Sequence, residues 1–287
     1  MITLQTAENA LKAVYLGVIS SKLNSETSPL LGKIKQSSAD IYGAKILKVP
    51  SWQNRYEDCP ILQEKLSNMY AGIELTDKAV RCAQNSAGAF VDLLNAEIEG
   101  LMRNIQTETS QALYRNSIHF DFVGLNELFD TKQTTLYGLS KRKYRELNAI
   151  NLEEAEITPY RLMEIIDNYN DEVNIIVCGK KILRDYKQYL INHNQNIEVI
   201  NLSGGFNGVE FNGIPMVTDR FVEDNEIYLL NTNDFEFKQL CDWQWLENES
   251  GKIITQVSGR PLYRATLVKY GNLICNNPSK QIKITIK

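Results

Sequence analysis

One uninterrupted helical pattern, from Thr76 to Arg115, constrains the fold of this chain more than any other feature of its sequence. Thr76 can cap the first turn, because its hydroxyl oxygen accepts a hydrogen bond from a free backbone N–H. No proline interrupts the segment, and apolar residues recur at spacings of three and four: Val80, Ala83, Ala87, Phe90, Leu94, Ile98, Leu101 and Ile105. A helix of about 40 residues would be roughly 60 Å long, far above the globular average. The pattern therefore predicts one long spine helix.

The segment before this helix predicts an N-terminal arm and a long hairpin. Residues 6–24 place most of their apolar side chains on one helical face, which indicates a short helix within an arm of residues 1–39. Two extended runs, Asp40 to Val49 and Asn68 to Leu75, indicate the strands of a hairpin over residues 40–75. Because an isolated two-stranded ribbon is only marginally stable, we expect the arm and the hairpin to bury apolar residues against other copies of the chain.

The part of the chain after the spine helix divides into two patterns. Residues 158–233 alternate helix and strand, with a buried strand expected from Val173 to Cys178, so they predict a compact α/β block. Residues 234–287 contain mostly strand patterns. Together with the spine helix, these segments predict a protein of the α+β class.

Composition excludes several classes of function. The 287 residues are 43% hydrophobic and 23% charged, with a net charge of −4, so no overall attraction to nucleic acid or to an anionic membrane is expected. The five cysteines are scattered and the histidines number only two, which argues against zinc sites and disulfide frameworks. No secretory signal and no apolar run long enough to span a membrane occurs. We expect a soluble protein with reduced thiols and without a cofactor.

Three local groupings carry residues that are used in binding or catalysis elsewhere. The glycine-rich segment 203–208 is followed by a strand pattern rather than a helix, so a turn is favoured over a phosphate-binding loop. The acidic run 153–156 fits a solvated surface better than a pair of catalytic carboxylates. The basic run 141–145 is a candidate nucleic-acid patch, but the acidic segment downstream weakens its field, and a surface loop or subunit contact is favoured. No catalytic motif is found, so we expect no enzyme.

Several short sequence segments, in a fixed order, resemble segments of one known protein family. They are Leu136-Tyr137-Gly138-Leu139 with Arg142 and Tyr144, Gly204-Gly205 leading into Phe211-Asn212-Gly213-Ile214-Pro215, and Tyr263-Arg264-Ala265 through Asn277-Pro278. With the order of arm, hairpin, spine helix, α/β block and β-rich end, the chain resembles the Hong Kong 97 fold of tailed-phage major capsid proteins. The resemblance implies an N-arm (residues 1–39), an E-loop (40–75), a P domain with the spine helix (76–157), an A domain (158–233) and C-terminal P-domain strands (234–287).

The resemblance also implies a function and its partners. Copies of the chain would self-assemble, as pentamers and hexamers, into an icosahedral shell around packaged double-stranded DNA, which an acidic chain would contact only loosely. The shell would be the virion capsid, assembled in the cytoplasm of a bacterial host, with a portal as a further partner. No fused scaffolding segment precedes the arm, so the resemblance implies a separate scaffolding protein, a processed N-terminus, or assembly without a scaffold.

Two sets of residues are candidates for contacts between subunits. At the expected hairpin tip, Arg55, Glu57 and Asp58 could form charged contacts. Some family members crosslink a hairpin lysine to an asparagine of a neighbouring subunit. By residue type alone, the partners here would be one of two lysines and one of two asparagines: Lys45, Lys48, Asn276 and Asn277.

Two alternatives remain open. The first is an encapsulin-like nanocompartment shell, which shares the fold but packages enzymes. The second is an α/β enzyme built on residues 158–233, which would hold a ligand in a pocket near Gly204.

Overall fold

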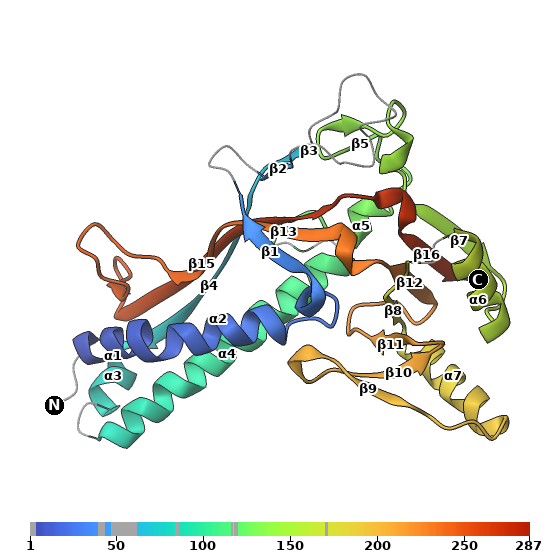
Figure 1. The fold of residues 1–287 in the computed structure, drawn as a ribbon. Coiled ribbons are helices and arrows are strands. Elements are labelled where there is room, and N and C mark those ends of the chain that lie inside the picture. The colour runs from blue at the N-terminus through green and yellow to red at the C-terminus, as the bar shows by residue number, and fades with distance from the viewer. Residues whose placement is uncertain are drawn as a thin grey trace.

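The computed structural model describes residues 4–39, 44–46, 62–83, 86–115, 117, 120–169 and 172–287. Two main sheets lie at opposite ends of an elongated molecule (Figure 1). Two long helical segments run along the first sheet, and two shorter helices cover one face of the second sheet. The predicted α+β class is confirmed.

The first sheet has five strands in the order β1-β13-β15-β14, with β4 on the other side of β15. Their bounds are β1 Lys35–Ser38, β4 Ser67–Thr76, β13 Phe235–Trp245, β14 Thr255–Gln256 and β15 Leu262–Cys275. Strand β4 alternates strictly, with Met69 and Ile73 buried while Tyr70 and Glu74 are exposed. Such alternation gives the sheet one apolar face, against which the long helices pack.

The N-terminal helical segment is part of the body of the molecule. It comprises α1 (Leu4–Ala10), a π-helical turn η1 (Leu11–Tyr15) and α2 (Leu16–Ser25). Leu11 and Ile19 are almost fully buried within the same chain, and the indole Nε1 of Trp245 donates to the carbonyl of Leu11 at 3.1 Å. The expectation that this arm buries its apolar face on other copies is therefore wrong, because β13 and α4 already cover that face.

The predicted spine helix is two helices, α3 (Asp77–Ala83) and α4 (Ala87–Tyr114). Ser86 adopts an extended backbone and its hydroxyl accepts a hydrogen bond from the Ala89 N–H at 3.3 Å. Serine is favoured at helix N-caps over helix interiors. A new helix therefore begins at Ser86, although the spacing of the apolar residues continues across this position. The 28 residues of α4 still make a helix roughly 42 Å long.

The predicted hairpin exists, but with a different second strand. Strand β2 (Ala44–Ile46) pairs antiparallel with β3 (Leu62–Glu64). Residues 68–75, expected to close the hairpin, instead belong to β4 and pair antiparallel with β15 along its length. The alternating pattern correctly indicated a strand, but it carried no information about which partner that strand has.

The second sheet has seven strands in the order β7-β16-β12-β8-β11-β10-β9. Their bounds are β7 Ile150–Glu154, β8 Ile175–Cys178, β9 Val199–Asn201, β10 Asn207–Phe211, β11 Ile214–Thr218, β12 Glu226–Leu230 and β16 Ile282–Ile286. Helices α6 (Pro159–Tyr169) and α7 (Lys180–Asn192) cover one face, and side chains packed around α4 cover the other. Successive residues of β8 and β12 therefore pack alternately into the core beneath α6 and α7 and into the core around α4.

The composition of this sheet corrects the expected domain boundaries. The sequence places residues 234–287 with the first sheet, but β16 lies between β7 and β12 in the second. Ile282 and Ile284 are fully buried there, so the last strand is an interior strand of the second sheet. The α/β block thus consists of residues 158–233 together with β7 and β16.

Short elements connect these parts. They are α5 (Leu125–Leu128), the strand pair β5 (Thr135–Leu136) and β6 (Leu139–Ser140), and the 3-10 turns η2 (Leu31–Lys33), η4 (Arg145–Leu147), η5 (Ser203–Gly205), η6 (Thr232–Asp234) and η7 (Pro278–Lys280).

Candidate functional site

The described part of the chain contains no group of three or more histidine, cysteine or acidic side chains that could hold a metal ion. Burial raises the pKa of the Cys178 thiol to about 12, and it raises the pKa of Cys275 well above its usual value. Both thiols therefore stay protonated and are poor nucleophiles. Of the helices described, none is both long and apolar enough to cross a membrane.

Part of the basic run 141–145 has contacts inside the subunit, whereas the side chains of Arg142, Lys143 and Arg145 are exposed. The Lys141 side chain is buried, and its Nζ donates to the carbonyl oxygen of Asp130 at 2.9 Å. The Nζ of Lys143 lies 5.0 Å from the ring centroid of the buried Tyr144. These contacts show that the run belongs to a structured surface loop.

The acidic run 153–156 forms ion pairs within the subunit. Glu154 Oε1 lies 2.8 Å from the guanidinium of Arg161 on α6, and Glu153 pairs with Lys287 near the end of β16. The two pairs link strand β7 to α6 and to the end of the chain after β16, and pairs as exposed as these contribute little to stability.

The predicted turn at the glycine-rich segment is confirmed. Gly204 and Gly205 both have a φ of +78°. A Cβ on Gly204 would lie 2.0 Å from the carbonyl oxygen of Ser25, at the end of α2. The turn therefore touches the N-terminal helix, and glycine is required because no side chain fits between them.

The residues predicted to contact neighbouring subunits are only partly within the described chain. Arg55, Glu57, Asp58 and Lys48 lie outside the described residues, whereas the backbone of Lys45 lies in β2. Their roles remain predictions.

The two asparagines proposed as crosslink partners follow β15. Asn277 Nδ2 donates to Asp234 Oδ1 at 2.5 Å, and Gln281 Nε2 donates to the backbone carbonyl of Asn277 at 3.1 Å. The Asn277 amide is thus engaged within its own subunit. Crosslinking by Asn276 or Asn277 also remains a prediction.

A buried polar cluster that the sequence did not indicate anchors the N-terminal helix to the first sheet. The Nζ of Lys269 lies 3.1 Å from Asp242 Oδ1 and donates to Asn24 Oδ1 at 2.8 Å, while Ser20 Oγ donates to Asp242 Oδ2 at 2.7 Å. Burial lowers the pKa of Lys269. The pKa of Asp242 is also lowered, since burial raises it but the hydrogen bond from Ser20 and the Lys269 ammonium oppose this effect more strongly.

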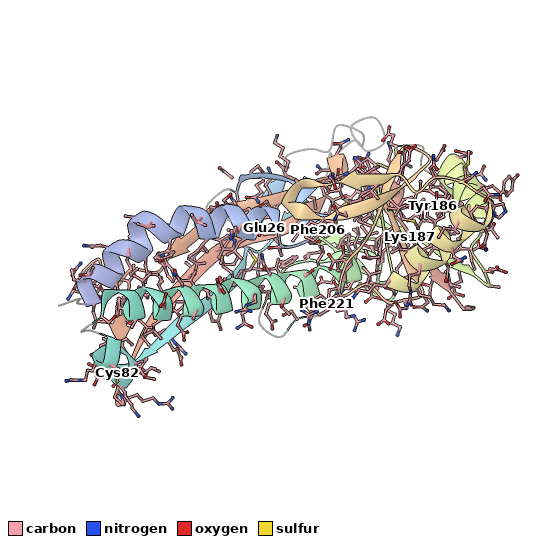
Figure 2. The ribbon with its side chains drawn as sticks, turned by 90° about the horizontal axis from the view of Figure 1, so that it is seen from below. Glu26, Cys82, Tyr186, Lys187, Phe206 and Phe221 are labelled. Carbon is pink, nitrogen blue, oxygen red and sulfur yellow. The ribbon has the colours of Figure 1, made fainter. Side chains whose placement is uncertain are left out.

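A second buried carboxyl joins three parts of the molecule. Asp219, which follows β11, accepts hydrogen bonds from Ser28 Oγ at 2.7 Å and from Ser110 Oγ of α4 at 2.9 Å. Burial raises its pKa, against the opposing effect of these two hydroxyls. Figure 2 shows Glu26, Phe206 and Phe221 around this junction, where a cleft of about 290 Å³ opens between the N-terminal segment, α4 and the second sheet.

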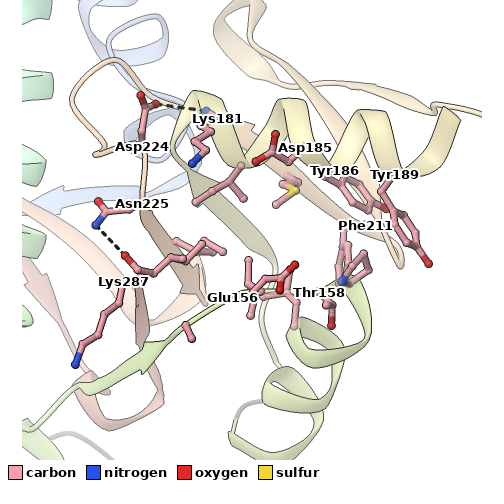
Figure 3. Close-up of a pocket in the computed structure, with 18 residues that line it drawn as sticks. Glu156, Thr158, Lys181, Asp185, Tyr186, Tyr189, Phe211, Asp224, Asn225 and Lys287 are labelled. Carbon is pink, nitrogen blue, oxygen red and sulfur yellow. Dashed lines mark hydrogen bonds between the residues drawn. The ribbon is translucent and has the colours of Figure 1, made fainter. Parts of the chain in front are cut away.

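A larger cavity, of about 540 Å³, lies between α6 and α7 over the second sheet (Figure 3). Side chains such as Leu162 and Met216 give it an apolar lining. Lys181 and Asp224 stand at one end, and Tyr186 with its neighbouring aromatic residues stands at the other. Its other polar lining residues include Glu156, Thr158 and Asp185.

Large apolar side chains are exposed on several elements. They include Val14 (64% exposed) on η1, Tyr70 (58%) on β4, Tyr160 (79%) on α6, Ile191 (55%) on α7, Val199 (61%) on β9 and Leu246 (52%) after β13. These side chains lie on several different elements of the chain.

The sequence matches no protein-family model and no curated protein sequence. The structure, in contrast, is similar to several solved structures. A capsid chain of cyanophage A-1(L) superimposes with a TM-score of 0.61 at 13% identity, over 96% of this chain and 92% of that one. The SrpI encapsulin of Synechococcus elongatus PCC 7942 gives a TM-score of 0.58 at 12% identity, over 88% and 84%. A chain of the satellite phage P4 procapsid gives 0.53 at 9% identity, over 96% and 91%.

The chain has the Hong Kong 97 fold. The resemblance expected from the sequence is thereby confirmed at the level of the fold. Within the Hong Kong 97 fold, α4 is the long helix that the sequence predicted, shortened by its cap at Ser86.

Proposed function

We propose that this chain is the subunit of a closed protein shell, the major capsid protein of a tailed-phage-type particle. The observation that carries the proposal is the similarity to shell-forming chains over almost the entire length of both partners, 96% and 92% for the cyanophage capsid chain. Exposed apolar side chains on both sheets and on four helical segments support it, because a subunit that contacts several neighbours needs such surfaces on several sides.

In this proposal the parts of the chain take the roles that the resemblance implies, with two adjustments. The N-terminal helix belongs to the body of the subunit, and the A domain is the whole second sheet, including β7 and β16. A domains would meet around five-fold and six-fold axes, forming pentamers and hexamers. The hairpin that contains β2 and β3 is the E-loop, which would lie across the adjacent subunit.

Self-association is the work of such a subunit. Burial of apolar surface contributes about 25 cal/mol per Å². Each copy makes several contacts at once, so closure of the shell stabilises every single contact further. Weak individual interfaces are therefore sufficient for a stable shell.

The content of the shell is proposed to be double-stranded DNA, contacted loosely because the chain carries a net charge of −4. The proposal includes a portal, a separate scaffolding protein and assembly in a bacterial cytoplasm. The similarity to the SrpI encapsulin supports shell formation equally well. The second candidate function is therefore an encapsulin-like shell that encloses protein.

Electron microscopy of the protein expressed in bacteria tests both parts of the proposal. We expect closed particles or hexameric and pentameric rings, and nuclease-resistant nucleic acid inside the particles once portal and scaffold are present. Particles filled with a co-purified protein and free of nucleic acid would favour the encapsulin-like function. A preparation of dispersed single subunits would contradict the shell function itself.

A further inference from the structure

Helix α7 presents a basic flank that forms no ion pair with the described residues. Lys180, Arg184 and Lys187 recur at i, i+4 and i+7, so they lie on one side of the helix. The part of the chain that the structure describes offers no carboxylate in ion-pair contact with any of the three. Asp185, the one acidic residue of α7, lies on the opposite side and lines the cavity toward α6.

Exposed apolar residues continue this flank. Ile191, one turn beyond Lys187, is 55% exposed. Val199 of the edge strand β9 is 61% exposed and stands opposite Val209 of β10, which is buried beneath α7. Directly opposed residues of an antiparallel pair point to the same face of the sheet, so Val199 lies on the α7 side at its edge. The α7 flank is defined as these five residues: Lys180, Arg184, Lys187, Ile191 and Val199.

The other end of the same sheet carries the opposite charge. Arg161 of α6 binds Glu154 of β7, which places α6 at the β7 edge, while α7 contacts β11 and β10 toward the β9 edge. Residues 153–167 contain five carboxylates and one guanidinium, and Lys287 pairs with Glu153, so the formal charge at this end is −5 + 2 = −3. Residues 180–192 contain four cations and one carboxylate, a formal charge of +4 − 1 = +3.

The exposed side of α6 also combines charge with apolar surface. Tyr160 is 79% exposed and Met163 is 42% exposed. Asp167 and Glu164, whose carboxylate also pairs with Arg161 at 2.9 Å, lie on the same turns of the helix. The α6 flank is defined as four residues: Tyr160, Met163, Glu164 and Asp167. Each flank of the second sheet is thus part charged and part apolar, and the two charges have opposite sign.

We propose that the α7 flank of one copy packs against the α6 flank of the next copy, head to tail. This inference rests on the proposed shell function, and it identifies the pair of surfaces that join A domains within one ring. Two different surfaces at opposite ends of one sheet form a heterologous contact, and such contacts close into rings when the rotation between copies is suitable. Exposed Ile191 and Val199 among the cations favour a protein partner over nucleic acid, since phosphates offer no apolar surface to cover them.

Charge reversal on one flank, and then on both, tests the contact in the full-length chain. In K180E/R184E both changed side chains are exposed, so the fold is expected to persist. The variant would bring two acidic flanks together, and we expect assembly at low salt to require a roughly tenfold higher protein concentration. The fourfold variant K180E/R184E/E164K/D167K restores opposite charges and is expected to assemble at the concentration of the parent chain. K180R/R184K, which keeps the charge, is the matched control and is expected to assemble normally.

Light scattering and electron microscopy across a concentration series distinguish the outcomes. If the parent chain assembles and K180E/R184E assembles equally well, the contact is wrong while the shell function stands. Shells of K180E/R184E that form normally but no longer retain nucleic acid would likewise overturn it, in favour of a DNA-binding role. Failure of the fourfold variant to recover, with its circular dichroism unchanged, contradicts the pairing of the two flanks. A parent chain that stays monomeric overturns the shell function and this contact together.

Discussion

Removal of the Asp242 carboxylate should loosen the N-terminal helix from the body of the subunit. The side chain of Lys269 is only 4% exposed, so the D242A variant leaves its ammonium group buried without its counterion. Loss of one partner of a fully buried ion pair costs about 3–5 kcal/mol, but Asp242 itself is 43% exposed and water will reach part of the site. We therefore expect D242A to lower the free energy of unfolding by about 2 kcal/mol, including lost hydrogen bonds to Ser20 and Asn24.

The double variant D242N/K269M is the informative control, because it removes both charges and keeps the approximate volume of both side chains. Replacement of a buried ion pair by neutral groups is often close to neutral, so we expect a stability within about 1 kcal/mol of the parent chain. Urea denaturation followed by tryptophan fluorescence measures both variants, since Trp243 lies beside Lys269 and Trp245 lies beneath the helix. Hydrogen exchange over residues 4–25 should rise in D242A alone. A loss below about 0.5 kcal/mol in D242A, or a double variant no more stable than D242A, would refute the reasoning.

Three further predictions concern individual residues. L11A should lower the free energy of unfolding by about 2–5 kcal/mol, because Leu11 is fully buried. V14A, on the exposed side of the same helix, should change it by less than about 0.5 kcal/mol. Equal effects of the two variants in urea denaturation would contradict the docked position of the N-terminal helix. An alanine in a left-handed backbone conformation costs roughly 1–2 kcal/mol. G204A should lower the free energy of unfolding by more than this, since its Cβ would also clash with α2. G205A, whose Cβ would meet open space, should lower it only by the cost of the backbone conformation. Burial raises the pKa of Asp219, so folding favours the protonated form of this carboxyl. The stabilisation from the protonated carboxyl is therefore present at low pH and is lost as the pH rises through the pKa of Asp219 in the folded state. The stability of the parent chain relative to D219N should therefore increase from pH 7 toward pH 4, and a difference independent of pH would show that Asp219 does not titrate there.

The local patterns in the sequence predicted the elements well, because each depends on neighbours along the chain. The helical period that begins at Thr76 and the alternation of residues 68–75 both correspond to real elements. The break at Ser86 was missed because an apolar period can continue in phase across a capped restart of the helix. That cap was visible in principle, since serine prefers such positions.

Pairings between distant segments could not be derived in the same way. Strand β4 pairs with β15, almost 200 positions later, and β16 joins a sheet whose other strands begin at residue 150. A strand pattern shows which face is buried but not what buries it, so the partner of β4 and the location of β16 were assigned to the nearest plausible neighbours. The docking of the N-terminal helix was missed for the same reason, because Asn24, Asp242 and Lys269 become a cluster only in the folded chain. The order of the segments was nevertheless sufficient to indicate the fold.

Sedimentation velocity of the purified chain over a wide range of concentrations tests the central claim most directly. Shell formation through many weak contacts is cooperative, so we expect monomers or small rings below a threshold concentration and one discrete, very fast boundary above it. A single monomer boundary at every concentration and ionic strength, from a chain that circular dichroism shows to be folded, would contradict the assignment of this Hong Kong 97 fold to a self-assembling shell.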